Sequence, residues 1–450
     1  MQFVSTTKCK KIITGFLLTA LFSTTYAQEN SPYSRYGLGD MVNNTNILNR
    51  GMGGITIGFG SERFLNNTNP ASYSFIGQPL SRIRDYGKLI SFEVGSEFNS
   101  RTLLQQNPEG KYNSKNVYFN YMQLGMQLSK NGNWGLNFGL LPLTRESYKI
   151  SNFGRINGID SIQTVYEGNG GAYQAFLGSA YRFKNLSVGF NTGYTFGKKE
   201  STTNLRLDND SVYYYESSSN TRANFGGVFL NTGVMYNHII GKGKSLKFGA
   251  TYNIRHKLKT NENLERVSYE NDNSSNPNQG TDTIYLAADR KGNITYPSGF
   301  GIGFTYEKED ALLFGLDFTS QSWSQYRYLN QADQLQNSWM VKSGVQIIPN
   351  ARAAGYWNKA AYRAGFYYGK DYIKATGKDL PVYALTFGIG LPTVKPTYSK
   401  DFKAISPTVI NLSLEVGARG NKTNNLRENF VRVGLAVSLS DIWFFKPKYQ

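Results

Sequence analysis

Side chains that commonly carry catalytic chemistry are scarce in this chain of 450 residues. His238 and His256 are its two histidines, and neither has a cysteine or carboxylate cluster nearby at the spacing of metal ligands. Gly301 and Gly303 lie within a strand pattern with no helix after it, which argues against nucleotide binding. No Gly-x-Ser-x-Gly elbow is present. We therefore expect no enzyme activity, no metal site and no cofactor.

Two short motifs are notable for their backbone chemistry. In Asn69-Pro70-Ala71, the proline restricts Asn69 to extended backbone, and an asparagine amide can hydrogen-bond irregular chain to its surroundings. Gly139 and Pro142 lie in an otherwise apolar strand pattern. Proline cannot donate to a sheet ladder, and glycine has no side chain to fill a wall. This pair predicts weak pairing of its strand with a neighbour; the alternative is an ordinary bulge.

The elements that must position these motifs are strands with one apolar face. In the segment 185–197, Leu186, Val188 and Phe190 alternate with Ser, Gly and Asn, and the segments 246–254 and 431–439 repeat the pattern. A soluble sandwich would rarely place so much glycine on its outward face. A membrane barrel instead turns its apolar face to lipid and its small, polar face to a wet or plugged lumen. A large soluble all-β protein is the alternative.

We predict an all-β, 14-stranded antiparallel transmembrane β-barrel. Its strand candidates lie near 88–104, 115–129, 133–149, 163–183, 185–205, 221–240, 245–262, 294–307, 311–326, 337–348, 359–373, 381–391, 408–418 and 428–440. Tight turns near 130–132, 184–185, 241–244 and 308–310 alternate with expected long polar loops near 150–162, 206–220, 263–293 and 327–336. This alternation is typical of outer-membrane barrels, whose long loops face outward. The long connection 392–407 does not fit it.

The N-terminus predicts export. Residues 1–27 combine three lysines, an apolar stretch and small residues at a cleavage site, as in a signal peptide. Cys9 lies within this segment, so the mature chain would have no cysteine. Residues 28–86 are rich in Gly, Asn and Ser and do not alternate, which favours an N-terminal plug, or hatch, in the lumen. Residues 87–450 would form the barrel.

Composition narrows the set of partners. The chain carries a net charge of +18 and is 14% aromatic, with a mean hydropathy of −0.44. Its Lys and Arg residues are scattered without a basic stripe, so we expect no nucleic-acid binding. Membrane lipid, and anionic glycolipid in particular, is the expected partner of this charge.

Several strings resemble the FadL family of outer-membrane transporters for hydrophobic compounds. Asn69-Pro70-Ala71 matches the Asn-Pro-Ala signature of the family's hatch, after the glycine-rich turn 51–54. The runs 300–306 and 339–345 resemble later family strands in the right order. The resemblance implies fourteen strands, a hydrophobic small-molecule ligand, and a lateral opening in the third strand, here at Gly139 and Pro142. The ending 441–445 with its basic tail and the 392–407 connection depart from the family pattern.

Two functions fit an integral outer-membrane protein of this kind. The first is uptake of fatty-acid-like or aromatic small molecules through the plugged barrel and its lateral opening. The alternative is a non-transporting structural subunit of an outer-membrane protein secretion or assembly machine, with other outer-membrane proteins as partners. They differ in whether the lumen holds an apolar pocket with a continuous exit.

We expect the motif Asn69-Pro70-Ala71 to lie inside the barrel. The alternative is a surface turn before the first strand.

Overall fold

The computed structural model describes residues 31–77, 88–129, 131–156, 159–208, 215–270, 282–351, 353, 355–375, 377–393 and 408–443. The predicted signal peptide, nearly all of the 392–407 connection and the basic tail lie outside these residues. No helix among the described residues is both long and apolar enough to cross a bilayer.

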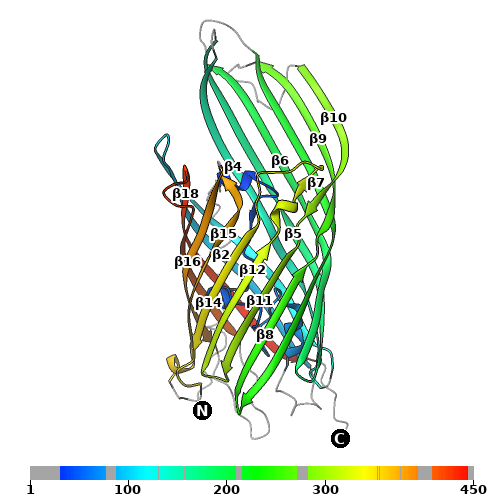
Figure 1. The fold of residues 1–450 in the computed structure, drawn as a ribbon, viewed down its shortest axis with the longest axis vertical. Coiled ribbons are helices and arrows are strands. Elements are labelled where there is room, and N and C mark those ends of the chain that lie inside the picture. Colours follow the sequence, from blue (N-terminus) through cyan, green and yellow to red (C-terminus); the bar gives the residue numbers. More distant parts are fainter. Residues whose placement is uncertain are drawn as a thin grey trace, which may run out of the picture.

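The described strands form a closed antiparallel barrel (Figure 1). Its strand segments are β2 (Lys88–Gln105), β3 (Gly110–Gln127), β4 (Trp134–Ile156), β5 (Ile159–Phe183), β6 (Leu186–Asp208), β7 (Tyr215–Gly241), β8 (Lys244–Asn253), β9 (His256–Glu270), β10 (Asp282–Tyr296), β11 (Gly299–Lys308), β12 (Leu312–Gln321), β14 (Ser338–Ile347), β15 (Ala361–Ala375), β16 (Lys378–Pro392), β17 (Val409–Arg419) and β18 (Leu426–Trp443). β8 continues into β9, and β10 into β11, so these described segments make fourteen barrel strands, as predicted.

Two short breaks explain why sixteen segments make fourteen strands. Ile254 and Arg255 separate β8 from β9, and Pro297 and Ser298 separate β10 from β11. The second break follows from proline's missing N–H. The seam of the barrel, between β18 and β2, pairs continuously from Leu426↔Gln105 to Trp443↔Lys88.

The expected long loops are largely strand. β4 and β5 stay paired as far as Ile156↔Ile159, and β6 pairs with β7 as far as Leu205↔Ser217. β9 pairs with β10 up to Ser268↔Asp282. The described residues of the predicted loops near 150–162, 206–220 and 263–293 are therefore strand, which corrects the prediction there, while residues 157–158, 209–214 and 271–281 lie outside the described part of the chain. The region 327–336 also contains a short strand, β13 (Arg327–Tyr328), paired with β10.

These extra residues form an extension that rises above one side of the barrel (Figure 1). Side chains of the extension are mostly polar on both faces, so the alternation that identifies a half-buried strand is missing there. Below it, outward side chains form an apolar band. Exposed members on β5 and β6 include Leu177, Tyr181, Phe183, Leu186, Val188 and Phe190. We define the extension as the parts of β4–β7, β9 and β10 above this band.

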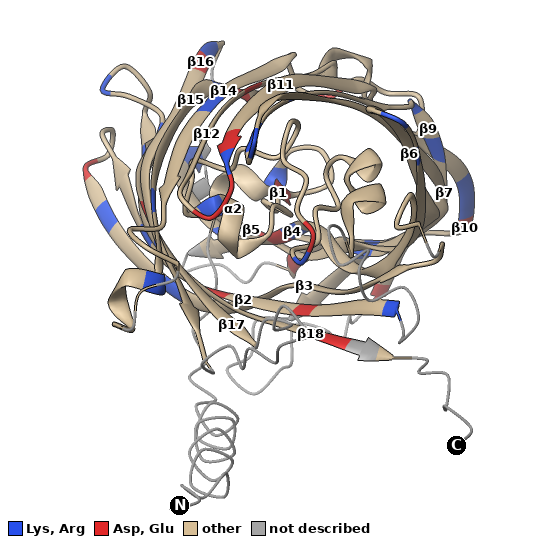
Figure 2. Cartoon of the chain, turned by 90° about the horizontal axis from the view of Figure 1, so that it is seen from below, with Lys and Arg blue, Asp and Glu red and all other residues tan. Residues whose placement is uncertain are grey.

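Residues 31–77, the described part of the predicted hatch, lie within the ring of strands (Figure 2). They contain η1 (Pro32–Arg35), β1 (Asp40–Met41), α2 (Ile47–Arg50) and η2 (Pro70–Phe75). η2 packs on β4–β7, and α2 packs on β16–β18. The hatch thus touches opposite parts of the wall.

Glycines on the lumen face allow this close packing. A Cβ atom at Gly249 would collide with the carbonyl of Ile57, and one at Gly135 would collide with the carbonyl of Tyr73. A Cβ at Gly344 would likewise meet the backbone of Met52. The small, polar face seen in the sequence is therefore the surface on which the hatch backbone rests.

Candidate functional site: the hatch, the seam and the wall

The Asn69-Pro70-Ala71 motif forms the start of η2 and is buried. The Asn69 side-chain amide donates to the Ile57 carbonyl at 2.7 Å, and its Oδ1 accepts from the Ala71 backbone N–H at 3.1 Å. Pro70 occupies the first position of this helix, where no N–H is needed. A Cβ at Gly189 of β6 would collide with the Pro70 backbone. The motif therefore joins the hatch to itself and rests on the wall.

The rest of η2 is hydrogen-bonded to barrel strands. The Tyr73 hydroxyl donates to Asn191 Oδ1 at 2.9 Å, and Ser74 Oγ donates to Ser187 Oγ at 2.8 Å. Asn191 in turn donates to the Asn67 carbonyl at 2.9 Å. These three hydrogen bonds involve β6, and Asn69 Nδ2 also donates to the Val234 carbonyl of β7 at 3.4 Å, so this end of the hatch is tied to two neighbouring strands.

At the other end of the hatch, Arg50 bridges the seam of the barrel. Its guanidinium forms a short ion pair with Glu97 of β2 and a 3.4 Å ion pair with Glu415 of β17. Burial alone would lower the pKa of Arg50, but Glu97 and Glu415 raise it above its usual range. Arg432 of β18 binds Glu415 at 2.6 Å. The cluster joins strands on both sides of the β18–β2 seam.

Asp40 of β1 forms a second bridge over the same seam. It pairs with Arg101 of β2 at 3.0 Å and with Arg419 of β17 at 2.8 Å. Ser31 Oγ donates to it at 2.6 Å. Burial opposes ionisation of Asp40, but Arg419 and Arg101 hold its pKa well below the usual range.

The wall ladder between β3 and β4 ends close to Gly139 and Pro142. The last pair is Met122↔Leu140, although β4 continues to Ile156 on its β5 side. On that side the register shifts between Pro142 and Thr144. The interruption is consistent with proline's missing donor. The motif therefore marks where β3 and β4 separate.

Two groups occupy the separation. β1 of the hatch pairs with β4 through Asp40↔Arg145 and Met41↔Thr144. The Arg145 guanidinium donates to the Phe119 carbonyl of β3 at 2.9 Å and lies 3.8 Å from the centre of the Tyr118 ring. The interruption in the ladder is therefore bridged by a side chain and by a hatch strand.

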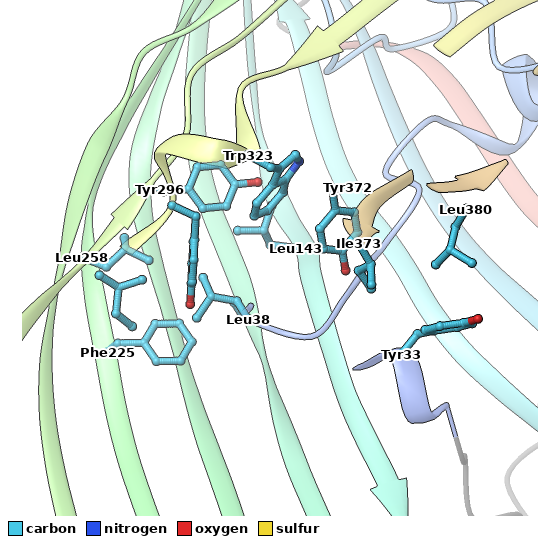
Figure 3. Close-up of a cluster of buried hydrophobic side chains, with 13 residues drawn as sticks. Tyr33, Leu38, Leu143, Phe225, Leu258, Tyr296, Trp323, Tyr372, Ile373 and Leu380 are labelled. Carbon is cyan, nitrogen blue, oxygen red and sulfur yellow. The ribbon is translucent and has the colours of Figure 1, made fainter. Parts of the chain in front are cut away.

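Apolar side chains of the hatch and the wall form one buried cluster in the lumen beside the extension (Figure 3). We call this set the lumen cluster: Tyr33, Leu38, Leu143, Ala172, Phe225, Leu258, Ile294, Tyr296, Trp323, Tyr326, Tyr372, Ile373 and Leu380. Trp323 is 1% exposed, and its ring centroid lies 4.6 Å from that of Tyr372. Two members come from the hatch, so hatch and wall share one core.

A cavity of about 360 Å³ lies between hatch and wall, and a second of about 460 Å³ lies between hatch residues near Phe59 and wall residues of β7 and β8. The first is lined by Asp40, Arg101 and Arg419 of the second seam bridge, by Lys342, and by Glu428, which pairs with Arg101 at 3.4 Å. Met41, Trp339 and Phe430 also line it, so its surface is part charged and part apolar.

His256, one of the two histidines, is held by contacts within the barrel. His256 donates through Nδ1 to the Ile254 carbonyl at 3.0 Å, and its ring lies 5.1 Å from that of Tyr296. No group of three His, Cys, Asp or Glu residues within the described part of the chain is arranged to hold a metal ion.

Sequence reasoning missed the seam bridges and the lumen cluster. Arg50 and Glu415 are 365 positions apart, and neither carries a local signal of pairing. The strand predicted near 311–326 includes Trp323 and Tyr326, but β12 ends at Gln321 and η4 (Trp323–Gln325) turns the chain there. The sequence contains one weak signal for the two acids of the seam bridge. Glu97 and Glu415 occupy polar-face positions in alternating strands, which is the face predicted to line the lumen.

Fold and site together define a transmembrane antiparallel β-barrel whose lumen holds the N-terminal segment 31–77. The family model of BamG matches residues 9–450, and the chain belongs to the BamG family. No curated protein was found to match the sequence.

Solved structures show the same fold. The Pseudomonas putida toluene transporter TodX is 15% identical, covers 88% of this chain and 98% of its own, and has a TM-score of 0.53. A TodX deltaS2S3 mutant, a monoaromatic hydrocarbon channel, gives 16% identity, 88% and 99% coverage, and a TM-score of 0.52. The Ralstonia pickettii toluene transporter TbuX gives 14% identity, 88% and 97% coverage, and a TM-score of 0.50.

Proposed function

We propose that this barrel is a non-transporting structural subunit of an outer-membrane protein secretion or assembly machine. The observation that carries the proposal is the lumen cluster, whose packed side chains lie in the lumen through which a hydrophobic cargo would have to pass. A cavity of about 360 Å³ between hatch and wall is lined in part by ion pairs. A transporter of hydrophobic molecules would need an apolar pocket with an exit in this region.

The paired seam between β18 and β2 supports a structural subunit rather than a subunit that opens its own barrel to insert client proteins. β18 and β2 pair along their whole length, and both hatch bridges cross them. A barrel that opened its own seam to receive a client would have to expose the charges of Arg50 and Asp40. Membership of the BamG family also favours the machine subunit over uptake.

Uptake of hydrophobic small molecules is the second candidate. The end of the β3–β4 ladder at Leu140 favours it, because this separation is where a lateral exit would lie. That route requires Arg145 to release Phe119 and the lumen cluster to repack. A hydrophobic cargo would also have to pass the charged side chains that line the cavity between hatch and wall.

Purification of the tagged protein in mild detergent tests the choice. We expect other outer-membrane proteins to co-elute in fixed ratio, and no lipid-like ligand to be extracted from the lumen. Cells producing the Arg145→Ala or Pro142→Val protein should take up radiolabelled toluene and oleate as fast as wild type. Stoichiometric hydrophobic ligand, together with slower uptake by Pro142→Val at normal protein level, would reverse the assignment.

A further inference from the structure

A groove on the outside of the barrel remains unassigned. It has a volume of about 670 Å³ and crosses β15, β16, β17, β18 and β2. Cross-strand pairs define its two walls. The upper wall is Tyr368, Tyr383, Ala418, Asn429 and Thr102; the lower wall is Phe366, Leu385, Val416, Val431 and Ser100.

The row between the two walls consists of Tyr367, Ala384, Gly417 and Phe430 and faces the lumen, so the floor of the groove is largely strand backbone. The upper wall is lowest at Ala418, because its side chain is smaller than those of its cross-strand neighbours Tyr383 and Asn429. The two ends differ: Phe366 and Tyr368 make one end aromatic, and Ser100, Thr102 and Asn429 make the other polar. The channel is therefore amphipathic along its length.

Basic side chains lie beside the polar end. Lys115 pairs with Ser100 across β3 and β2, so the two share the outward face. Arg427 and Lys111 both pair with Leu104, two residues from Thr102, and share that face too. The acids of the same strands point inward, where Glu97 and Glu428 bind Arg50 and Arg101. Glu109 lies in the turn above.

We infer that this groove binds one acyl chain of an outer-leaflet anionic glycolipid, a phosphorylated and acylated sugar. The groove is continuous with the apolar band, which accounts for the acyl chain. Hydroxyl and amide groups of Ser100, Thr102 and Asn429 suit sugar hydroxyls. Lys111, Lys115 and Arg427 attract the phosphates, and lysine side chains can extend from the membrane interface to reach them. The site lies toward the Gly420 turn, on the side of the barrel from which the extension rises and at the opposite end of the β18–β2 ladder from Trp443↔Lys88, which places it in the outer leaflet.

Native mass spectrometry of the detergent-purified chain tests this inference with three separate probes: diphosphoryl lipid A, phosphatidylglycerol and phosphatidylcholine. Wild type should retain one lipid A in preference to both phospholipids. Each of Lys111→Gln, Lys115→Gln and Arg427→Gln should weaken lipid A binding roughly fivefold. Ala418→Leu, which fills the groove without altering charge, should also weaken it.

The matched control is Lys259→Gln, an exposed cation of β9 on another part of the barrel. It should leave lipid A binding unchanged. The site would be overturned if phosphatidylcholine were retained as well as lipid A, or if Lys259→Gln lost as much lipid A binding as the groove variants. Lipid binding would then be a property of the whole barrel surface. Preference for phosphatidylglycerol over lipid A would overturn the glycolipid assignment. Because the site is outside the lumen, none of these results depends on the machine-subunit proposal.

Discussion

Arg50 of the hatch and Glu97 of the first barrel strand form an ion pair in which both side chains are almost fully buried. The same guanidinium reaches Glu415 of β17, next to the last strand. One hatch residue therefore joins the beginning and the end of the barrel sheet. Stability of the closed cylinder and placement of the hatch should respond together to its loss.

Replacing Arg50 with Met should destabilise the barrel by about 3–5 kcal/mol, because two acids would remain buried with fewer cationic partners. The unfolding temperature, followed by the heat-dependent shift of the barrel in gel electrophoresis, measures this. Lys198→Met is the control, since its pair with Glu200 is exposed and should contribute less than about 1 kcal/mol. Equal losses for the two variants would contradict a specific role for the seam bridge.

Adding one methyl group at Gly249 should displace the hatch. The new Cβ would collide with the Ile57 carbonyl, so we expect a loss of about 1–3 kcal/mol and faster proteolysis of the hatch. Gly241→Ala provides a matched control, because no atom lies within 4 Å of its Cβ position. If hatch proteolysis is the same in both variants, the hatch does not rest on this glycine.

Asn69→Ala removes the acceptor for the Ala71 N–H and the donor to the Ile57 carbonyl. Both backbone groups would remain buried without that partner, which costs about 1–3 kcal/mol each. Chemical denaturation in detergent measures the change. Asn358→Ala, at an exposed position, should stay within about 0.5 kcal/mol of wild type. An unaffected Asn69→Ala protein would argue against the motif as a fastening of the hatch.

Glu62 of the hatch should make stability fall as pH rises. Burial raises its pKa to about 8; Glu307 and Glu309 add to this, while Arg63 and Lys247 oppose it. The folded state therefore holds a proton that the unfolded state releases near pH 4.5, so stability declines between about pH 4.5 and pH 8. The Glu62→Gln protein should show a smaller decline over this range, and its stability should equal that of wild type below about pH 4.5. Parallel pH profiles for the two proteins would show that Glu62 does not cause the effect.

The strands of the apolar band could be predicted because their side chains alternate between lipid and lumen. Leu186, Val188 and Phe190 show this directly, and each of the fourteen barrel strands has a sequence counterpart. The extension was missed because its side chains are mostly polar on both faces, so the apolar alternation is absent there. Pro142 identified the end of the β3–β4 ladder within two residues. The Arg145 bridge across that gap depends on tertiary geometry, for which the sequence carries no periodic signal.

The two bridges over the seam also constrain how the protein is made. Glu97, Glu415 and Glu428 would line an empty cylinder next to Arg101, Arg419 and Arg432, and Asp40 and Arg50 complete their pairing. The N-terminal segment precedes every barrel strand in synthesis, so it is available as a template before the last strand arrives. Closure of the ring and neutralisation of its interior are therefore coupled, because the same two hatch residues pair with strands on both sides of the seam.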